Sequence, residues 1–226
     1  LQIHYNSLAG KKKVTSAFDY YAEAQSTSNR TPIRNFQVAA APNLPCVAPY
    51  NDVKKYPLCD YNKSMADLAK RTGTAAAQFT RLLDFVCNSG VRPTKATDAT
   101  ARSAQCIAGP QASTWTLHSI TPHMHMLGKT FSMAICRQDR TCATANQETL
   151  QVVPNYNFDN QFGYRLSSPV VVQPGDYFKI NCTYDPTLRK LNPQTKNLPP
   201  RYITWADGSS DEMCLGTLQY TLGAGT

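Results

Sequence analysis

Eight cysteines constrain the fold of this 226-residue chain more than any other feature of its sequence. Their number is even, and no two of them have the CxxC spacing of zinc ribbons and thioredoxin-like redox sites. Cysteines used in this way form disulfide bonds, which persist in oxidising compartments. We therefore expect a secreted, extracellular or periplasmic protein that is cross-linked by disulfides.

The composition excludes several classes of protein. Apolar residues make up 42% of the chain and charged residues only 17%, so the chain can bury a core and is not intrinsically disordered. No apolar run approaches the ~20 residues that a membrane-spanning helix needs. The net charge of +8 comes from scattered lysines and arginines, apart from residues 11–13. We therefore expect neither a nucleic-acid partner nor a membrane span.

Short strand-like runs separated by turn signals predict a mainly β fold. The expected strands are residues 1–5, 35–40, 114–120, 129–136, 149–153, 169–172, 176–184, 201–205 and 215–221. Turn signals such as Pro174-Gly175-Asp176 lie between them. Strands of this length and spacing are typical of an antiparallel β-sandwich, jelly-roll-like in its connections.

One segment has the periodicity of a helix. Apolar residues recur at intervals of three and four from Met65 to Val86, which places them on one helical face. Ser64 and Asp67 resemble a capping box, and residues 88–90 (Asn-Ser-Gly) form a stop signal. The pattern predicts a single helix.

Four cysteines bracket this helix, namely Cys46, Cys59, Cys87 and Cys106. We therefore expect a disulfide-bounded helical insertion at about residues 44–108 of the β fold. Such an insertion serves as a packing element or as a lid.

The run PHMHMLG at residues 122–128 carries the clearest chemical signal. Because side chains of an extended strand alternate between two faces, His123 and His125 project from the same face and can bind one metal ion. Met124 and Met126 then point into the core. Two nearby histidines are also common on surfaces that bind nothing, so this pair alone does not specify a metal site.

A second run, GSSDEMC at residues 208–214, places Met213 in an acidic turn before a cysteine. A buried methionine usually fills a gap in a core. Two imidazoles and a thioether nevertheless suit copper, because sulfur favours Cu(I) and the nitrogens tolerate both oxidation states. Together the two runs predict a copper site.

Four motifs, in the same order, resemble the copper type II, ascorbate-dependent monooxygenases, which include peptidylglycine α-hydroxylating monooxygenase and dopamine β-monooxygenase. They are PHMHMLGK from residue 122, YNFDNQ from residue 156 with Tyr164, PGDYFKINCTYD from residue 174 and GSSDEMC from residue 208. The resemblance covers residues 115–221 closely. It implies that residues 1–226 form a domain like the family's C-terminal catalytic domain.

The resemblance implies an oxygen-binding copper held by His123, His125 and Met213. In the family this site activates O2 to hydroxylate an aliphatic C–H, and the electrons come from ascorbate through a second copper. A disulfide between Cys182 and Cys214 is also implied, and it would fix the turn that carries Met213.

The opening LQIHYN looks like the start of the family's second domain, in which His4 would be a ligand of the second copper. The other two ligands of that copper are an adjacent His-His pair of the family's first domain. No such pair occurs in this chain. We therefore expect an N-terminal domain of the same protein to complete the second site.

The remaining six cysteines suggest local pairs. Cys136 and Cys142 flank a short turn, so we expect them to close a hairpin. Of the 15 connectivities that six cysteines allow, we favour the one that also pairs Cys46 with Cys59 and Cys87 with Cys106. The other pairings of these last four stay open.

The substrate is open at this stage. Peptide-amidating members of the family anchor the substrate carboxylate with an arginine and a tyrosine, whose positions hold Thr121 and Thr217 here. Neither threonine can form a charge-assisted contact. Two other hypotheses compete with the enzyme: a non-catalytic secreted copper-binding protein, and a structural or assembly module that retains the fold.

Overall fold

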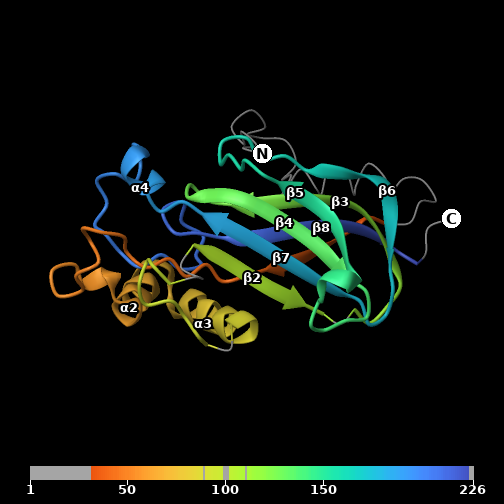
Figure 1. Ribbon diagram of the computed structural model, residues 1–226, viewed down its shortest axis with the longest axis horizontal. Helices are drawn as coiled ribbons and strands as arrows, with labels where there is room; N and C mark the ends of the chain where they lie inside the picture. Colours follow the sequence, from red (N-terminus) through yellow and green to blue (C-terminus); the bar gives the residue numbers. More distant parts are fainter. Residues whose placement is uncertain (1–31, 89, 99–101, 110, 224–226) are drawn as a thin grey trace, which may run out of the picture.

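The computed structural model describes residues 32–88, 90–98, 102–109 and 111–223 of the chain. Two four-stranded antiparallel sheets pack face to face, with strand orders β1-β8-β3-β6 and β2-β7-β4-β5 (Figure 1). The strands are β1 (Arg34–Ala39), β2 (Ser103–Ala108), β3 (Trp115–Met124), β4 (Gly128–Cys136), β5 (Gln147–Val153), β6 (Tyr164–Val172), β7 (Tyr177–Tyr184) and β8 (Cys214–Leu222). The predicted mainly β sandwich is confirmed.

The core lies between the sheets and follows from the alternation of side chains along each strand. In β7 every second residue is buried, namely Phe178, Ile180, Cys182 and Tyr184. Burial of such a face is the main favourable contribution to folding, at about 25 cal/mol per Å² of apolar surface. The disulfide from Cys182 in β7 to Cys214 in β8 links the two sheets through this core.

The helical segment consists of two helices, α2 (Tyr61–Thr72) and α3 (Thr74–Asn88), so the prediction of one helix is wrong. Gly73 separates them at φ 93°, a conformation that favours glycine. The predicted capping box is also wrong, because Asp60 caps α2 by accepting a hydrogen bond from the N–H of Lys63. Ser64 instead donates to the backbone oxygen of Tyr202.

The break changes which side chains the helices bury. Met65 and Leu68 of α2 are each 1% exposed, as the periodicity predicts. In α3, by contrast, Phe79, Leu82 and Val86 are 47%, 58% and 63% exposed. The predicted apolar face is therefore buried in α2 but not in α3. The buried residues of α3 are Ala77, Thr80 and Asp84 instead.

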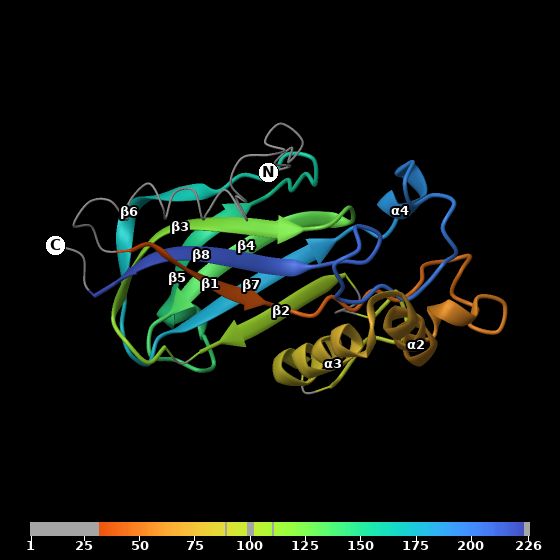
Figure 2. The same cartoon turned by 180° about the vertical axis from the view of Figure 1, so that it is seen from behind.

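Two strand predictions also need correction. Residues 103–108, at the end of the expected insertion, form β2, which pairs along its whole length with β7. Residues 201–205 form no strand but only isolated bridges, from Ile203 to Leu44 and from Trp205 to Glu212. The helices lie at one end of the sandwich beside β2 (Figure 2).

The structure contains four disulfides, and all of them are expected pairs: Cys46–Cys59, Cys87–Cys106, Cys136–Cys142 and Cys182–Cys214. They agree with folding in an oxidising compartment. Within the described ranges, no helix has the length and apolar character that crossing a bilayer requires.

Candidate metal centre

The end of β3 and the start of β8 place the two sequence motifs side by side. These strands pair antiparallel, with His123 opposite Leu215 and Met124 opposite Cys214. His125 follows Met124 in the chain and Met213 precedes Cys214, so these two residues flank the last pair of the ladder. The end of β3 points toward the end of the sandwich that carries α2 and the short helix α4 (Leu188–Leu191) (Figure 2). Strand pairing therefore brings together residues that lie about 90 positions apart in the chain.

The two histidines lie together, as the alternation along the strand predicts. Their ring centroids are 5.1 Å apart and the ring planes are nearly perpendicular. His123 is partly exposed, whereas His125 is 4% exposed. Met124 and Met126 are buried at 0% and 8% exposure, as expected for side chains that point away from the pair.

Hydrogen bonds fix the tautomer of each imidazole. Gln161 donates from its side-chain nitrogen to the backbone oxygen of Phe158, so its Oε1 faces Nδ1 of His123 at 2.6 Å. Nδ1 of His125 lies 3.2 Å from the backbone oxygen of Asp211. Because both partners are acceptors, each Nδ1 carries the proton and each Nε2 carries a lone pair. Metal-binding histidines are oriented in this way.

Burial keeps both rings neutral. Burial, together with the nearby ring of His123, lowers the pKa of His125 to about 4. Burial also lowers the pKa of His123, which outweighs the opposite effect of its hydrogen bond to Gln161. Since only a neutral imidazole can bind a metal ion, the pair is competent to do so near pH 7.

The segment YNFDNQ packs around the pair. The hydroxyl of Tyr156 accepts from the N–H of Met124 at 2.8 Å and donates to its carbonyl at 2.7 Å. Phe158 meets the ring of His125 edge-on at 6.0 Å. Gly128 permits this packing, because a Cβ there would lie 2.8 Å from the Tyr156 ring. One segment therefore fixes the end of β3 and both histidine rings.

Met213 is held by its backbone. The residue is 8% exposed, and its carbonyl accepts a hydrogen bond from the hydroxyl of Tyr184 at 3.0 Å. Its N–H lies 3.3 Å from Oε2 of Glu212. The next residue, Cys214, is tied to Cys182 by the inter-sheet disulfide. The position of Met213 is thus set by the fold and needs no ligand to fix it.

Glu212 is the central residue that the sequence analysis missed. It is 0% exposed, and its carboxylate accepts from the N–H groups of Leu127 at 2.6 Å and His125 at 2.9 Å as well as from Met213. Burial raises the pKa of this carboxyl to about 8, against the three donors, which favour the ionised form. One side chain therefore joins the histidine turn to the methionine turn.

A cavity of about 150 Å³ lies beside the segment that packs around the pair. It is bordered by Gln161, the partner of His123, and by Pro122, and no charged side chain lines it. Thr121 and Thr217, at the two positions where the amidating enzymes carry a carboxylate anchor, face each other across β3 and β8. The lining of this cavity, as far as the structure describes it, is therefore polar but uncharged.

The described residues supply no alternative third ligand of the usual kind. Among them, no group of three or more His, Cys, Asp and Glu side chains is arranged to hold a metal ion. Within the described ranges, a third ligand of another type, such as the thioether of Met213, is compatible with this pair. His118 lies elsewhere and bonds to Thr221, and His4 is outside the described residues.

The C-terminal part of the chain is similar to a known protein family. The family described as copper type II ascorbate-dependent monooxygenase, C-terminal domain, matches residues 91–222. The matched range includes the histidine run, the segment around Tyr156 and the turn of Met213. A search among curated proteins finds no match.

Proposed function

The chain belongs to the copper type II ascorbate-dependent monooxygenase family through its C-terminal domain, and we propose that His123, His125 and Met213 bind the copper at which this domain hydroxylates a substrate. The observation that supports the proposal is the pairing of β3 with β8, which brings the turn before Cys214 next to the strand end that carries two neutral imidazoles. The donor set fits copper, since two nitrogens and a thioether suit Cu(I) and still accept Cu(II). Bound copper would supply the activation of O2 for attack on an aliphatic C–H bond.

The protein's own groups would prepare this site in three ways. Gln161 and the carbonyl of Asp211 hold the protons on Nδ1, which leaves both Nε2 atoms ready. Glu212 keeps the histidine and methionine turns at a fixed separation. The uncharged cavity beside Gln161 admits a neutral part of a substrate and offers no carboxylate anchor. A peptide with a C-terminal carboxylate is therefore a poor candidate substrate.

We further propose that electrons from ascorbate arrive through a second copper, which His4 would help to hold. The chain contains four histidines and no His-His pair. The other ligands would come from an N-terminal domain of the same protein. The metal content of this chain can be tested separately from turnover, because turnover requires both sites.

Copper stoichiometry of the purified chain is the test of the first proposal. With His4 replaced by alanine, one copper per chain is expected. That copper should be lost on adding His123→Ala or Met213→Ala, while His118→Ala serves as the matched control. Stoichiometry that does not change in the His123 and Met213 variants would sink the proposal. Ascorbate-driven oxygen consumption, measured when an N-terminal domain is present, separates an enzyme from a copper carrier.

A further inference from the structure

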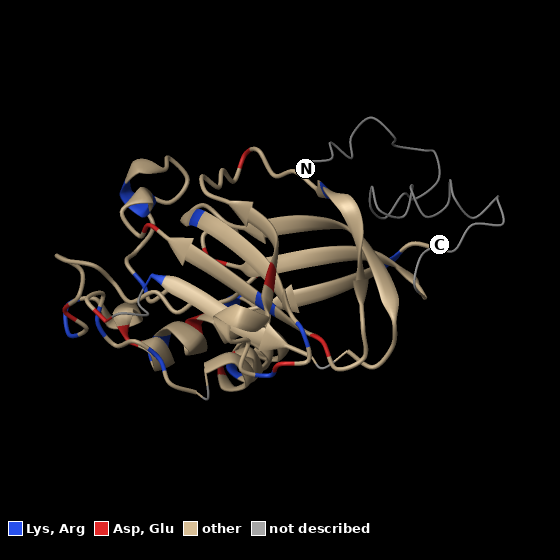
Figure 3. Ribbon diagram, turned by 45° about the vertical axis from the view of Figure 1, so that its right-hand side comes forward, with Lys and Arg blue, Asp and Glu red and all other residues tan. Residues whose placement is uncertain are grey.

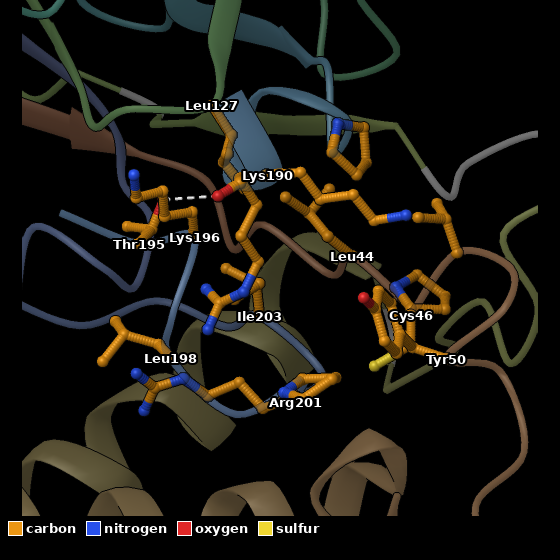
Figure 4. Close-up of a pocket in the computed structure, with 15 residues that line it drawn as sticks. Leu44, Cys46, Tyr50, Leu127, Lys190, Thr195, Lys196, Leu198, Arg201 and Ile203 are labelled. Carbon is orange, nitrogen blue, oxygen red and sulfur yellow. Dashed lines mark hydrogen bonds between the residues drawn. The ribbon is translucent and has the colours of Figure 1, made fainter. Parts of the chain in front are cut away.

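A second cavity, of about 110 Å³, lies away from the proposed copper ligands, none of which lines it (Figure 4). Its walls come from the loop at residues 44–50, the segment around α4 and the stretch from Leu198 to Ile203. Several of the side chains are apolar, namely Leu44, Val47, Leu127, Leu198 and Ile203. The volume holds a small organic molecule, since one water needs about 10–15 Å³ by this measure.

The charged groups of this cavity are all cationic. Arg189, Lys190, Lys196 and Arg201 line it, whereas no aspartate or glutamate does. Charged side chains of both signs gather on the helices and loops at this end of the molecule, while the strands carry few (Figure 3). An apolar hollow with a purely cationic lining is complementary to an anion that has an apolar body.

Nearby carboxylates do not neutralise these guanidinium groups. Asp211 forms a two-bond pair with Arg71, at 2.9 and 3.0 Å, and Asp67 bonds Arg71 at 2.7 Å. Arg201 lies farther from both acids, at 3.6 and 3.7 Å. The guanidinium of Arg189 donates to the backbone oxygens of Ser210 and Pro199. The cluster thus has three guanidinium groups and only two carboxylates.

Arg201 provides an independent indication of a missing partner. Its side chain is 7% exposed, and among the described residues its Nε is the one buried side-chain nitrogen or oxygen that lacks a hydrogen-bond partner. A buried donor without an acceptor costs about 1–3 kcal/mol. Burial, together with the positive charge of Arg201, lowers the pKa of Arg189 to about 10. An anion between the two groups would relieve both costs.

We propose that this cavity binds a small monocarboxylate with an apolar body, whose carboxylate is held by Arg189 and Arg201. The carboxylate can accept from the guanidinium groups of Arg189 and Arg201, both of which line the cavity, and these are charge-assisted contacts. Its apolar body packs against Leu44, Leu198 and Ile203. The site is separate from the proposed copper centre and does not depend on it.

Calorimetric titration of the metal-free chain with hexanoate in EDTA tests the proposal, because chelation prevents the carboxylate from binding through copper. Saturable binding of one hexanoate per chain is expected. Hexanamide has the same apolar body without the charge, and its affinity should be lower than that of hexanoate by about tenfold or more. Inorganic phosphate lacks the apolar body and should also bind more weakly. Equal binding of hexanamide or phosphate, or no saturable binding of hexanoate, overturns the proposal.

Variants locate the binding. Arg189→Met removes one guanidinium and should weaken hexanoate binding about tenfold, while Arg140→Met removes an exposed charge in a distant turn and should leave it unchanged. Val47→Asp places a competing carboxylate in the cavity and should abolish binding. Circular dichroism and the melting temperature show that each variant is folded. The site would be contradicted if Arg189→Met and Arg140→Met bound hexanoate with equal affinity. It would also be contradicted if a folded Val47→Asp variant bound hexanoate as tightly as the wild type.

Discussion

The candidate metal centre and the helical segment are attached to the same sandwich in different ways. At the candidate metal centre, β3 pairs with β8 as far as Met124 and Cys214, and three hydrogen bonds to Glu212 join the adjoining turns of His125 and Met213. The helices α2 and α3 share only a small buried cluster, made of Met65, Leu68, Ala77 and Ala206. The Cys87–Cys106 disulfide and polar contacts add to their attachment, among them the hydrogen bond from Asn43 to the buried acid Asp84 and the pair of Arg71 with Asp211.

This difference teaches where the sequence can vary. A centre built from register cannot move a ligand without shifting a whole strand, since a slip of one residue turns every side chain to the opposite face. The helical segment tolerates exposed apolar residues such as Phe85, at 69% exposure, because few of its positions are buried. We therefore expect substitutions at the centre to change both stability and copper affinity, and substitutions at the apolar positions of the helices to change stability alone.

The largest expected effect comes from the inter-sheet disulfide. Replacing Cys182 and Cys214 with alanine opens a loop of 32 residues and should lower the free energy of unfolding by about 4 kcal/mol. Copper affinity should fall as well, because the turn of Met213 loses its anchor. The matched control replaces Cys87 and Cys106, which are 19 residues apart in the sequence. It should lower the free energy of unfolding by about 3 kcal/mol without a change in copper affinity. Urea denaturation and copper titration measure both quantities. Equal losses of copper affinity in the two variants would break the comparison.

A pair of leucines sharpens the contrast within the helices. Leu68 is 1% exposed, so Leu68→Ala should lower the unfolding free energy by about 2–5 kcal/mol through lost contacts and a cavity. Leu82 is 58% exposed, and Leu82→Ala should change it by less than about 0.5 kcal/mol. Urea denaturation of both variants is the measurement. If Leu82→Ala lowered the unfolding free energy as much as Leu68→Ala does, the exposed face of α3 would have to be covered in solution.

Glu212→Gln tests the link between the two turns. Glutamine has the same shape, but its amide group presents a donor to a backbone N–H, so we expect a loss of about 1–3 kcal/mol of stability. Copper affinity should fall about 10–100-fold, as for other groups that support metal ligands. Glu148→Gln, at an exposed position, is the control and should cost less than about 1 kcal/mol. Wild-type copper affinity in a folded Glu212→Gln would show that the carboxylate does not position the centre.

The sequence predicted those parts of the fold that depend on local alternation. It missed β2, whose buried residues, Ala104 and Cys106, are small and lack the β-branched signal of a strand. It wrongly predicted a strand at residues 201–205, where all five residues are buried but only isolated bridges form. One helix was expected where Gly73 makes two, since periodicity does not show whether a glycine ends a helix.

At the site, the histidine pair was predictable because it depends on a period of two along one strand. Glu212 was not, since an acid in an acidic turn usually faces solvent. Its role depends on unpaired N–H groups at Leu127 and His125, which only the folded chain brings within reach. The unpartnered Nε of Arg201 could not be predicted from the sequence either. It depends on Asp67 and Asp211 forming their hydrogen bonds with Arg71.

X-ray absorption spectroscopy of the copper(I) form is the most direct test of the proposed centre. With His4 replaced by alanine, we predict one copper with nitrogen and sulfur neighbours. The sulfur contribution should disappear in Met213→Ala and persist in Met126→Leu, which changes a buried methionine one residue from His125. A sulfur contribution that persists in Met213→Ala would contradict the account, because the thioether of Met213 would then not be the ligand.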